Sequence, residues 1–145
     1  MPETQDFKNH GRVVPMYHMG VFFPFVINFF WSAYRLVSVG LSADTIIAFL
    51  MAVAFLLLFV SVRGQILTVQ DRVIRLEMRL RLASLLPPDL RSEIGTLTVR
   101  QLVALRFASD AELVDLTREV LAGKLATPKE IKMKVKNWVA DFQRA

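Results

Sequence analysis

Two histidines are the side chains in this sequence best suited to bind a metal or transfer protons, because imidazole does both near neutral pH. His10 and His18 stand on either side of Pro15 and have no further ligand at metal-binding spacing. The chain has no cysteine, which excludes disulfides, thiolate metal sites and a cysteine nucleophile. We expect both histidines to be structural or interfacial and expect no cofactor. The alternative is a haem, metal or proton-relay role.

Acid–base catalysis would require two carboxylates that converge on one buried site. The densest acidic residues instead follow one another along the start of a predicted helix, where acids are favoured by the helix dipole. They are Asp110, Glu112, Asp115 and Glu119. The sequence also has no phosphate-binding glycine loop and no nucleophile elbow. These patterns predict a protein that is not an enzyme.

The elements that position these residues begin with a membrane-spanning pattern. The chain of 145 residues is 54% hydrophobic, above the usual globular fraction of about 45–50%, and its mean hydropathy is +0.42. Residues 45–62 form an uncharged apolar span, and the helical pattern then continues into an arginine-rich stretch, residues 63–86. We predict one helix of about 44 residues, roughly 66 Å long at about 1.5 Å per residue. It ends at Leu86 because Pro87 disfavours helical backbone before it.

A second apolar stretch, residues 16–39, predicts the first transmembrane helix, after a polar segment of residues 1–15 that lacks the pattern of a signal peptide. Pro24 predicts a kink because it leaves the carbonyl of Gly20 without a donor, and Asn28 should prefer a partner to lipid. An interfacial anchor is expected near the end of this helix, at Trp31, Tyr34 and Arg35.

The turn between the two spans, residues 40–44, is short enough to require an antiparallel membrane hairpin, with Ser42 or Asp44 as the cap of the second helix. Arg35 is the only basic residue close to that turn. Lys8 and Arg12 precede the first span, and a larger group follows the second: Arg63, Arg72, Arg75, Arg79 and Arg81. The positive-inside rule therefore predicts that both termini are cytoplasmic.

The stalk, residues 63–86, carries two apolar rows. The first seam has heptad spacing and consists of Val62, Ile66, Val69, Val73, Leu76, Leu80 and Ala83. The second seam lies on an adjacent face and consists of Leu67, Ile74, Met78, Leu82 and Leu85. One seam should carry the domain that follows. The other should contact a further copy or another protein, and we assign that contact to Ile74 and Met78 in the second seam. Acid–base pairs are expected between Asp71 and Arg75 and between Glu77 and Arg81.

Residues 87–145 predict a small helical domain with three capping boxes, at Thr98–Gln101, Ser109–Glu112 and Thr127–Glu130. The corresponding helices are expected over residues 99–107, 110–122 and 128–142. Such a small domain has a thin core, so we expect it to dock on the stalk. The fold class is therefore all-α: a membrane helical hairpin whose second helix extends into the cytoplasm and carries a small helical domain.

Basic residues suggest contacts with anionic lipid or an acidic partner, although a solvated face that only sets topology is the alternative. On the stalk they are Arg72, Arg75 and Arg79; on the last predicted helix they are Lys129, Lys132 and Lys136. That helix also has an apolar side with Ile131, Val135, Trp138 and Phe142, which favours packing in the domain over lipid binding. Without a concentrated basic groove, we expect no binding of nucleic acid.

Four ordered blocks, QDFKNHGRVVPMYH, VQDRVIRLEMRLRL, LTVRQLVALRFASDAEL and EIKMKVKNWVADF, resemble a family of small uncharacterised bacterial membrane proteins with two spans. The resemblance implies a bacterial inner-membrane protein with a cytoplasmic helical tail, and it implies no activity. We therefore expect an interaction or scaffold module in contact with membrane lipid, working as a homo-oligomer or within a larger membrane complex. The alternative is an accessory subunit of a membrane enzyme or transporter, with His10, His18, Asn28 or Arg35 lining a shared site.

Overall fold

The computed structural model describes residues 6–7 and 14–141, and the regular secondary structure of these residues is helical. Within residues 14–141 the chain divides into two compact units, an N-terminal unit of residues 14–67 and a C-terminal unit of residues 68–141. The boundary lies inside the long helix α2 (Ala43–Leu85) rather than at Pro87. Two helical segments, Met16–Ser38 and Ala43–Leu85, are long and apolar enough by length and composition to cross a membrane.

The N-terminal unit pairs helix α1 (Phe22–Ser38) with the first part of α2 through aromatic rings. Phe25 stacks on Phe55 with centroids 5.2 Å apart, and Phe29 lies 5.5 Å from Phe49. Because the partner number falls as the α1 number rises, the two segments run antiparallel. Small residues occupy the buried positions of this unit, which allows backbones to approach closely. They are Ser32, Thr45 and Ala52.

The expected distortion at Pro24 takes the form of a π-helix. The segment η1 (Met16–Val21) precedes α1 and contains Gly20, whose carbonyl cannot receive an N–H from proline. At the other end of α1, Gly40 has a φ of +93° and Ser42 caps α2, since its Oγ lies 3.2 Å from the Thr45 amide. Of the two predicted caps, Ser42 is confirmed.

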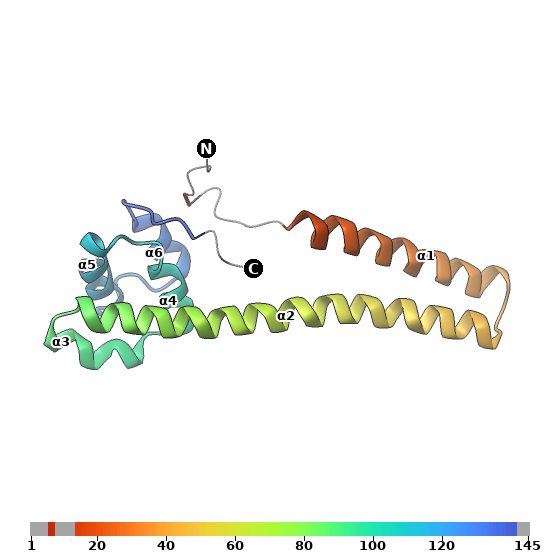
Figure 1. Ribbon diagram of the computed structural model, residues 1–145, viewed down its shortest axis with the longest axis horizontal. Coiled ribbons are helices and arrows are strands. Elements are labelled where there is room, and N and C mark those ends of the chain that lie inside the picture. Colours follow the sequence, from red (N-terminus) through yellow and green to blue (C-terminus); the bar gives the residue numbers. More distant parts are fainter. Residues whose placement is uncertain (1–5, 8–13, 142–145) are drawn as a thin grey trace. The chain divides into compact units, whose positions relative to one another are not determined.

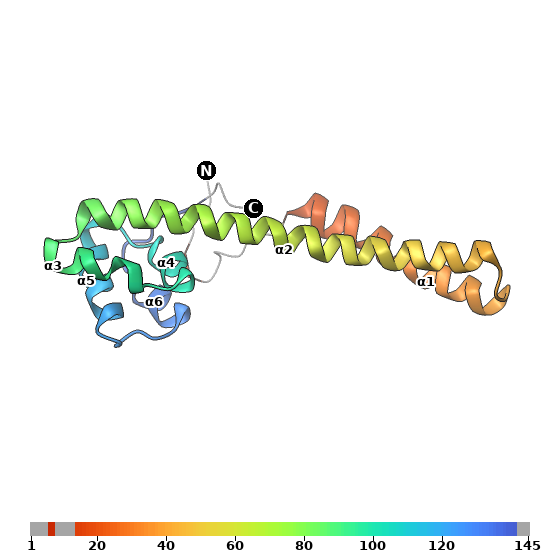
Figure 2. The same cartoon turned by 90° about the horizontal axis from the view of Figure 1, so that it is seen from below.

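The C-terminal unit gathers short helices beside the last part of α2, which runs without interruption to Leu85 as predicted (Figures 1 and 2). These elements are α3 (Pro88–Arg91), the 3-10 helix η2 (Ser92–Thr96), α4 (Val99–Leu105), α5 (Asp110–Leu121) and α6 (Pro128–Lys134). The boxes at Thr98 and Thr127 are made in both directions, and Gly123 ends α5 with a φ of +72°.

One core cluster joins α2 to every helix of the C-terminal unit. It combines Ile74, Met78, Leu82 and Leu86 with Leu90, Ile94, Leu97, Leu102, Ala104, Leu105, Ala108, Leu113, Leu116, Val120 and Ile131. Docking of the small domain on the stalk is therefore confirmed, and α2 is one wall of the core. Burial of this apolar surface is the main force that holds the unit together.

The last predicted helix is wrong in length, because α6 ends at Lys134 instead of continuing to residue 142. Val135 has extended backbone, and Trp138 forms an antiparallel β-bridge with Ala108. The Val139 amide donates to the Phe107 carbonyl at 2.8 Å, and the Ser109 amide donates to the Asn137 carbonyl at 3.2 Å. These long-range hydrogen bonds replace those that a longer helix would have made.

Candidate functional site

Arg81 fastens α2 to the connection between α4 and α5. Its Nε donates to Asp110 Oδ1 at 2.7 Å, its Nη2 donates to the Ala108 carbonyl at 2.7 Å, and its Nη1 lies 3.3 Å from the Arg106 carbonyl. The predicted pair between Glu77 and Arg81 is replaced by the ion pair with Asp110. A planar guanidinium can serve three acceptors at once, so this position suits arginine better than lysine.

Arg106 and Phe107 form a second cluster with the extended segment after α6. The Phe107 ring is fully buried and stacks on Trp138 with centroids 4.5 Å apart. The Arg106 guanidinium lies over the same Phe107 ring, 4.6 Å from its centroid, and one guanidinium nitrogen is 3.4 Å from Asp141 Oδ2. Aromatic stacking and the cation–π contact therefore hold residues 138–141 against α4.

Glu112 explains why the segment after α6 is extended. Its carboxylate accepts from the amides of Lys136 and Asn137, each at 3.0 Å, as well as from the Ser109 amide at 3.3 Å. Two of these donors would otherwise point back to carbonyls within a continued helix. A carboxylate on α5 thus both completes a capping box and ends α6.

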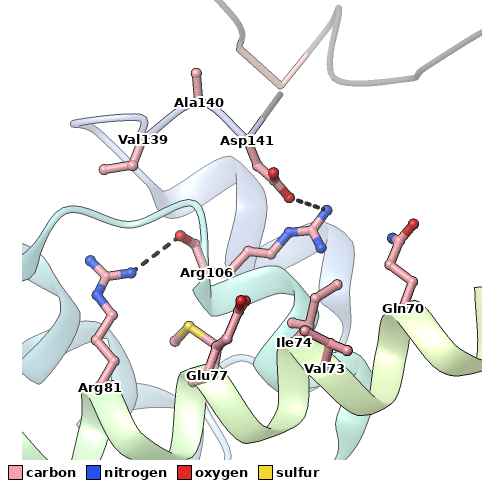
Figure 3. Close-up of a pocket in the computed structure, with 10 residues that line it drawn as sticks. Gln70, Val73, Ile74, Glu77, Arg81, Arg106, Val139, Ala140 and Asp141 are labelled. Atoms are coloured by element: carbon pink, nitrogen blue, oxygen red, sulfur yellow. Dashed lines mark hydrogen bonds and ion pairs between the residues drawn. The ribbon is translucent and has the colours of Figure 1, made fainter. Parts of the chain in front are cut away.

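A cleft of about 380 Å³ lies between α2 and these two clusters. Figure 3 shows the Arg81 guanidinium directed at the Arg106 carbonyl and the Arg106 guanidinium directed at Asp141. The wall formed by α2 consists of Gln70, Val73, Ile74, Glu77, Met78 and Arg81. The cleft has both apolar and charged sides, and in the part of the chain that the structure describes no three His, Asp or Glu side chains gather to hold a metal.

The structure reverses the predicted roles of the two stalk seams. Ile74 and Met78, predicted to contact a partner, are 5% and 2% exposed and belong to the core. Residues of the first seam within the C-terminal unit remain in solvent: Val69, Val73, Leu76 and Leu80 are 60%, 50%, 62% and 65% exposed. The spacing of apolar residues could not distinguish the seams, because both have helical periodicity.

The three stalk arginines predicted to contact lipid or an acidic partner lie together. Arg72 and Arg75 are exposed, Arg79 is half-buried, and all three line a shallow cleft of about 230 Å³ with Leu76. A neighbouring cleft of about 330 Å³ adds Arg100 from α4 to Arg72 and Arg75. Arg100 could not be grouped with the stalk arginines from its position in the sequence, because only the packing of α4 beside α2 brings it there.

A family model described as a family of unknown function, DUF6526, matches residues 1–145. The chain belongs to this family. No curated protein and no solved structure matches the chain. The Arg81, Arg106 and Trp138 contacts join three of the four sequence blocks of this DUF6526 chain into one cluster, so those blocks meet in space.

The predicted basic face of the last helix is not a single helical surface in this DUF6526 member. Lys129 is exposed on α6, whereas Lys136 lies beyond the end of that helix. Lys132 is half-buried, with its Nζ 5.4 Å from the Phe107 ring centroid. Ile131 is fully buried, as expected if this segment packs in its own domain.

The structure describes most of the residues that the sequence singles out in and before the first span. The Val14 amide lies 3.1 Å from His18 Nδ1, which can accept its hydrogen at the start of the helix. Asn28 is exposed and its side-chain amide forms no hydrogen bond to another described residue, and His10 lies outside the described residues. Towards the end of α1, Trp31 and Tyr34 are exposed with ring centroids 5.8 Å apart, and Arg35 is exposed beside them.

Proposed function

We propose that this protein anchors a non-enzymatic interaction module to the bacterial inner membrane. The two apolar helices would form a membrane hairpin, and the basic residues after the second span would keep both termini and the C-terminal unit in the cytoplasm. Trp31, Tyr34 and Arg35 would mark the opposite interface of the bilayer. Membrane lipid is then a constant partner, and Arg72, Arg75 and Arg79 are suited to anionic headgroups near the cytoplasmic surface.

The observation that carries this proposal is the exposed part of the first seam, Val69, Val73, Leu76 and Leu80. The C-terminal unit already has a core, yet these four apolar side chains on α2 remain outside it. A row of apolar residues with helical spacing on a folded domain supports contact with another helix. The catalytic alternatives receive no comparable support from the described residues.

The test is native mass spectrometry of the full-length protein extracted from its own membranes in a mild detergent. We expect an assembly that the double substitution Leu76→Gln with Leu80→Gln disrupts without changing membrane insertion. Met133→Gln is the matched control, because Met133 is a similarly exposed apolar residue on α6. An assembly that the double substitution leaves intact, or a wild-type monomer, would rule out the proposed interaction surface.

A role as accessory subunit of a membrane enzyme or transporter is the second candidate, and the exposed amide of Asn28 favours it. An amide at membrane depth gains from a hydrogen bond to another span, and no described residue provides one here. Native mass spectrometry distinguishes the two functions. A stable complex with a larger membrane protein that Asn28→Leu releases, and that the two glutamine substitutions do not affect, would favour the accessory role.

A further inference from the structure

Most of the exposed part of the first seam lies on the side of α2 opposite the core, with Val73 at its edge beside the cleft that Arg106 and Val139 also line. At about 3.6 residues per turn, Leu76 and Leu80 project opposite to the buried row that contains Ile74 and Met78. A second helix placed on this face would therefore meet α2 without displacing α3 to α6. The four side chains follow one another along about three turns of α2, and a row of this length suits a helix better than a small ligand.

The spacing along this face corresponds to a coiled-coil register. Val73 and Leu80 occupy a positions, and Val69 and Leu76 occupy d positions. A β-branched residue at a combined with leucine at d favours two strands. Val73 and Leu76 at the centre of the face follow that preference, whereas Val69 at d and Leu80 at a do not. The register thus suits a partner helix with the same repeat.

Charges beside the seam indicate the identity and direction of that helix. In this register Arg72 occupies a g position and Glu77 the following e position. In a parallel pair of identical helices, each g residue faces the e residue five positions later in the other chain, so Arg72 would meet Glu77 of the second copy twice. In an antiparallel pair g residues face g residues, which would bring arginines together.

Both groups are available for such a contact. Arg72 and Glu77 are exposed, and neither forms an ion pair with another described residue. Arg81, which could have neutralised Glu77 within the same helix, is instead bound to Asp110. Arg72 and Glu77 therefore form no ion pair within the described part of one chain and are available to a second copy.

We infer that two copies of this chain associate through α2 as a parallel two-stranded coiled coil, with the seam at its centre and Arg72 of each copy paired to Glu77 of the other. This inference rests on the proposed function and specifies its partner. Membrane anchoring favours the same direction, because both copies of α2 leave the bilayer on one side. A seam this short is marginal for free helices, and confinement to a membrane raises the effective concentration of the second copy.

The experiment uses full-length protein reconstituted in lipid nanodiscs or mild detergent, with dimer formation followed by native mass spectrometry over a dilution series. Arg72→Glu and Glu77→Arg each replace two attractive pairs with two repulsive ones. We expect each variant to raise the dissociation constant of the dimer on the order of tenfold. The double variant carrying both changes should return to within about threefold of wild type, since its pairs are again attractive.

Mixing the two single variants gives a sharper result. A chain with Arg72→Glu and a chain with Glu77→Arg complement each other at both pairs, so we expect the mixed dimer to exceed either homodimer. Arg75→Glu is the matched control, because Arg75 is an exposed arginine on the same helix outside the e and g positions. A mixture of Arg75→Glu and wild-type chains should form homodimers and mixed dimers in statistical proportions. A double variant as weak as the single variants, or statistical mixing of the two, would overturn the parallel pairing.

Crosslinking provides an independent measurement, because the chain has no cysteine. Val73→Cys should form an intermolecular disulfide under mild oxidation, since a positions of a parallel dimer are equivalent and close enough for one. Ala111→Cys, an exposed position on α5, should not. A complex that contains one copy of this chain with a different protein, and that the seam substitutions disrupt, would overturn self-pairing while leaving the proposed interaction function intact.

Discussion

Single side chains in the C-terminal unit act mainly as links between segments that are distant in sequence. Arg81 joins α2 to the α4–α5 connection, and Glu112 joins α5 to the segment after α6. Both are charged groups that bind backbone atoms, and Arg81 also binds the Asp110 side chain. Charge-assisted hydrogen bonds of this kind are stronger than neutral ones, so their loss should be measurable.

The clearest prediction at this scale concerns Arg81. Arg81→Gln should lower the free energy of unfolding of the C-terminal unit by about 1–3 kcal/mol, because glutamine cannot reach all three acceptors and carries no charge. Hydrogen exchange of α4 and α5 amides in the full-length protein measures the effect. Arg75→Gln is the control, since Arg75 is an exposed arginine on the same helix. Equal exchange in both variants would contradict the role assigned to Arg81.

Among the elements, α6 has a strong N-terminal cap but ends earlier than its sequence pattern predicts. Thr127, Pro128 and Glu130 form a proline-containing capping box that begins the helix. The helix then ends after two turns. The next amides, of Lys136 and Asn137, donate to the Glu112 carboxylate, and Trp138 pairs with Ala108 in a β-bridge. Local sequence sets the first residue of α6, and contacts with α4 and α5 set the last.

The cap of α6 predicts a specific dependence on pH. The hydrogen bond from the Thr127 backbone is the largest effect and lowers the pKa of Glu130; burial opposes it, and hydrogen bonds with the Ala126 amide and the Thr127 side chain lower the pKa further. A carboxyl group whose pKa is lower in the folded state stabilises the fold above its unfolded pKa of about 4.3. That contribution is lost as the pH falls through the lower, folded value.

We therefore expect wild type and Glu130→Gln to differ in the protection of α6 amides at about pH 6 and to converge at about pH 3. Hydrogen exchange corrected for its intrinsic pH dependence gives the comparison. Glu93→Gln, at an exposed carboxylate in η2, should follow wild type at α6 over the whole range. A constant difference between wild type and Glu130→Gln would show that the charge of Glu130 is not what caps the helix.

For the molecule as a whole, the central expectation is the direction in which the chain crosses the membrane. Because it has no cysteine, single cysteines can report topology without a background. Leu41→Cys lies in the exposed turn before α2 and should react with a membrane-impermeant maleimide added to spheroplasts. Ala111→Cys should react only after the membrane is opened. Labelling of Ala111→Cys in sealed spheroplasts would overturn the cytoplasmic assignment of the C-terminal unit.

Features that depend on neighbouring residues could be predicted from the sequence. The apolar helix that continues to Leu85, the stop before Pro87, the cap at Ser42 and the glycine end of α5 at Gly123 all follow from contacts within a few positions. Short-range steric and hydrogen-bonding rules are sufficient there, because the partners are fixed by chain connectivity.

Long-range packing was needed to distinguish between patterns that are equivalent in the sequence. Both stalk seams have helical spacing, and burial alone assigns Ile74 to the core and leaves Leu76 exposed. Arg81 had an acidic neighbour at helical spacing but binds Asp110 instead, and α6 stops because Glu112 accepts the next amides. These outcomes depend on groups brought together by packing, whose distances in space no local spacing encodes.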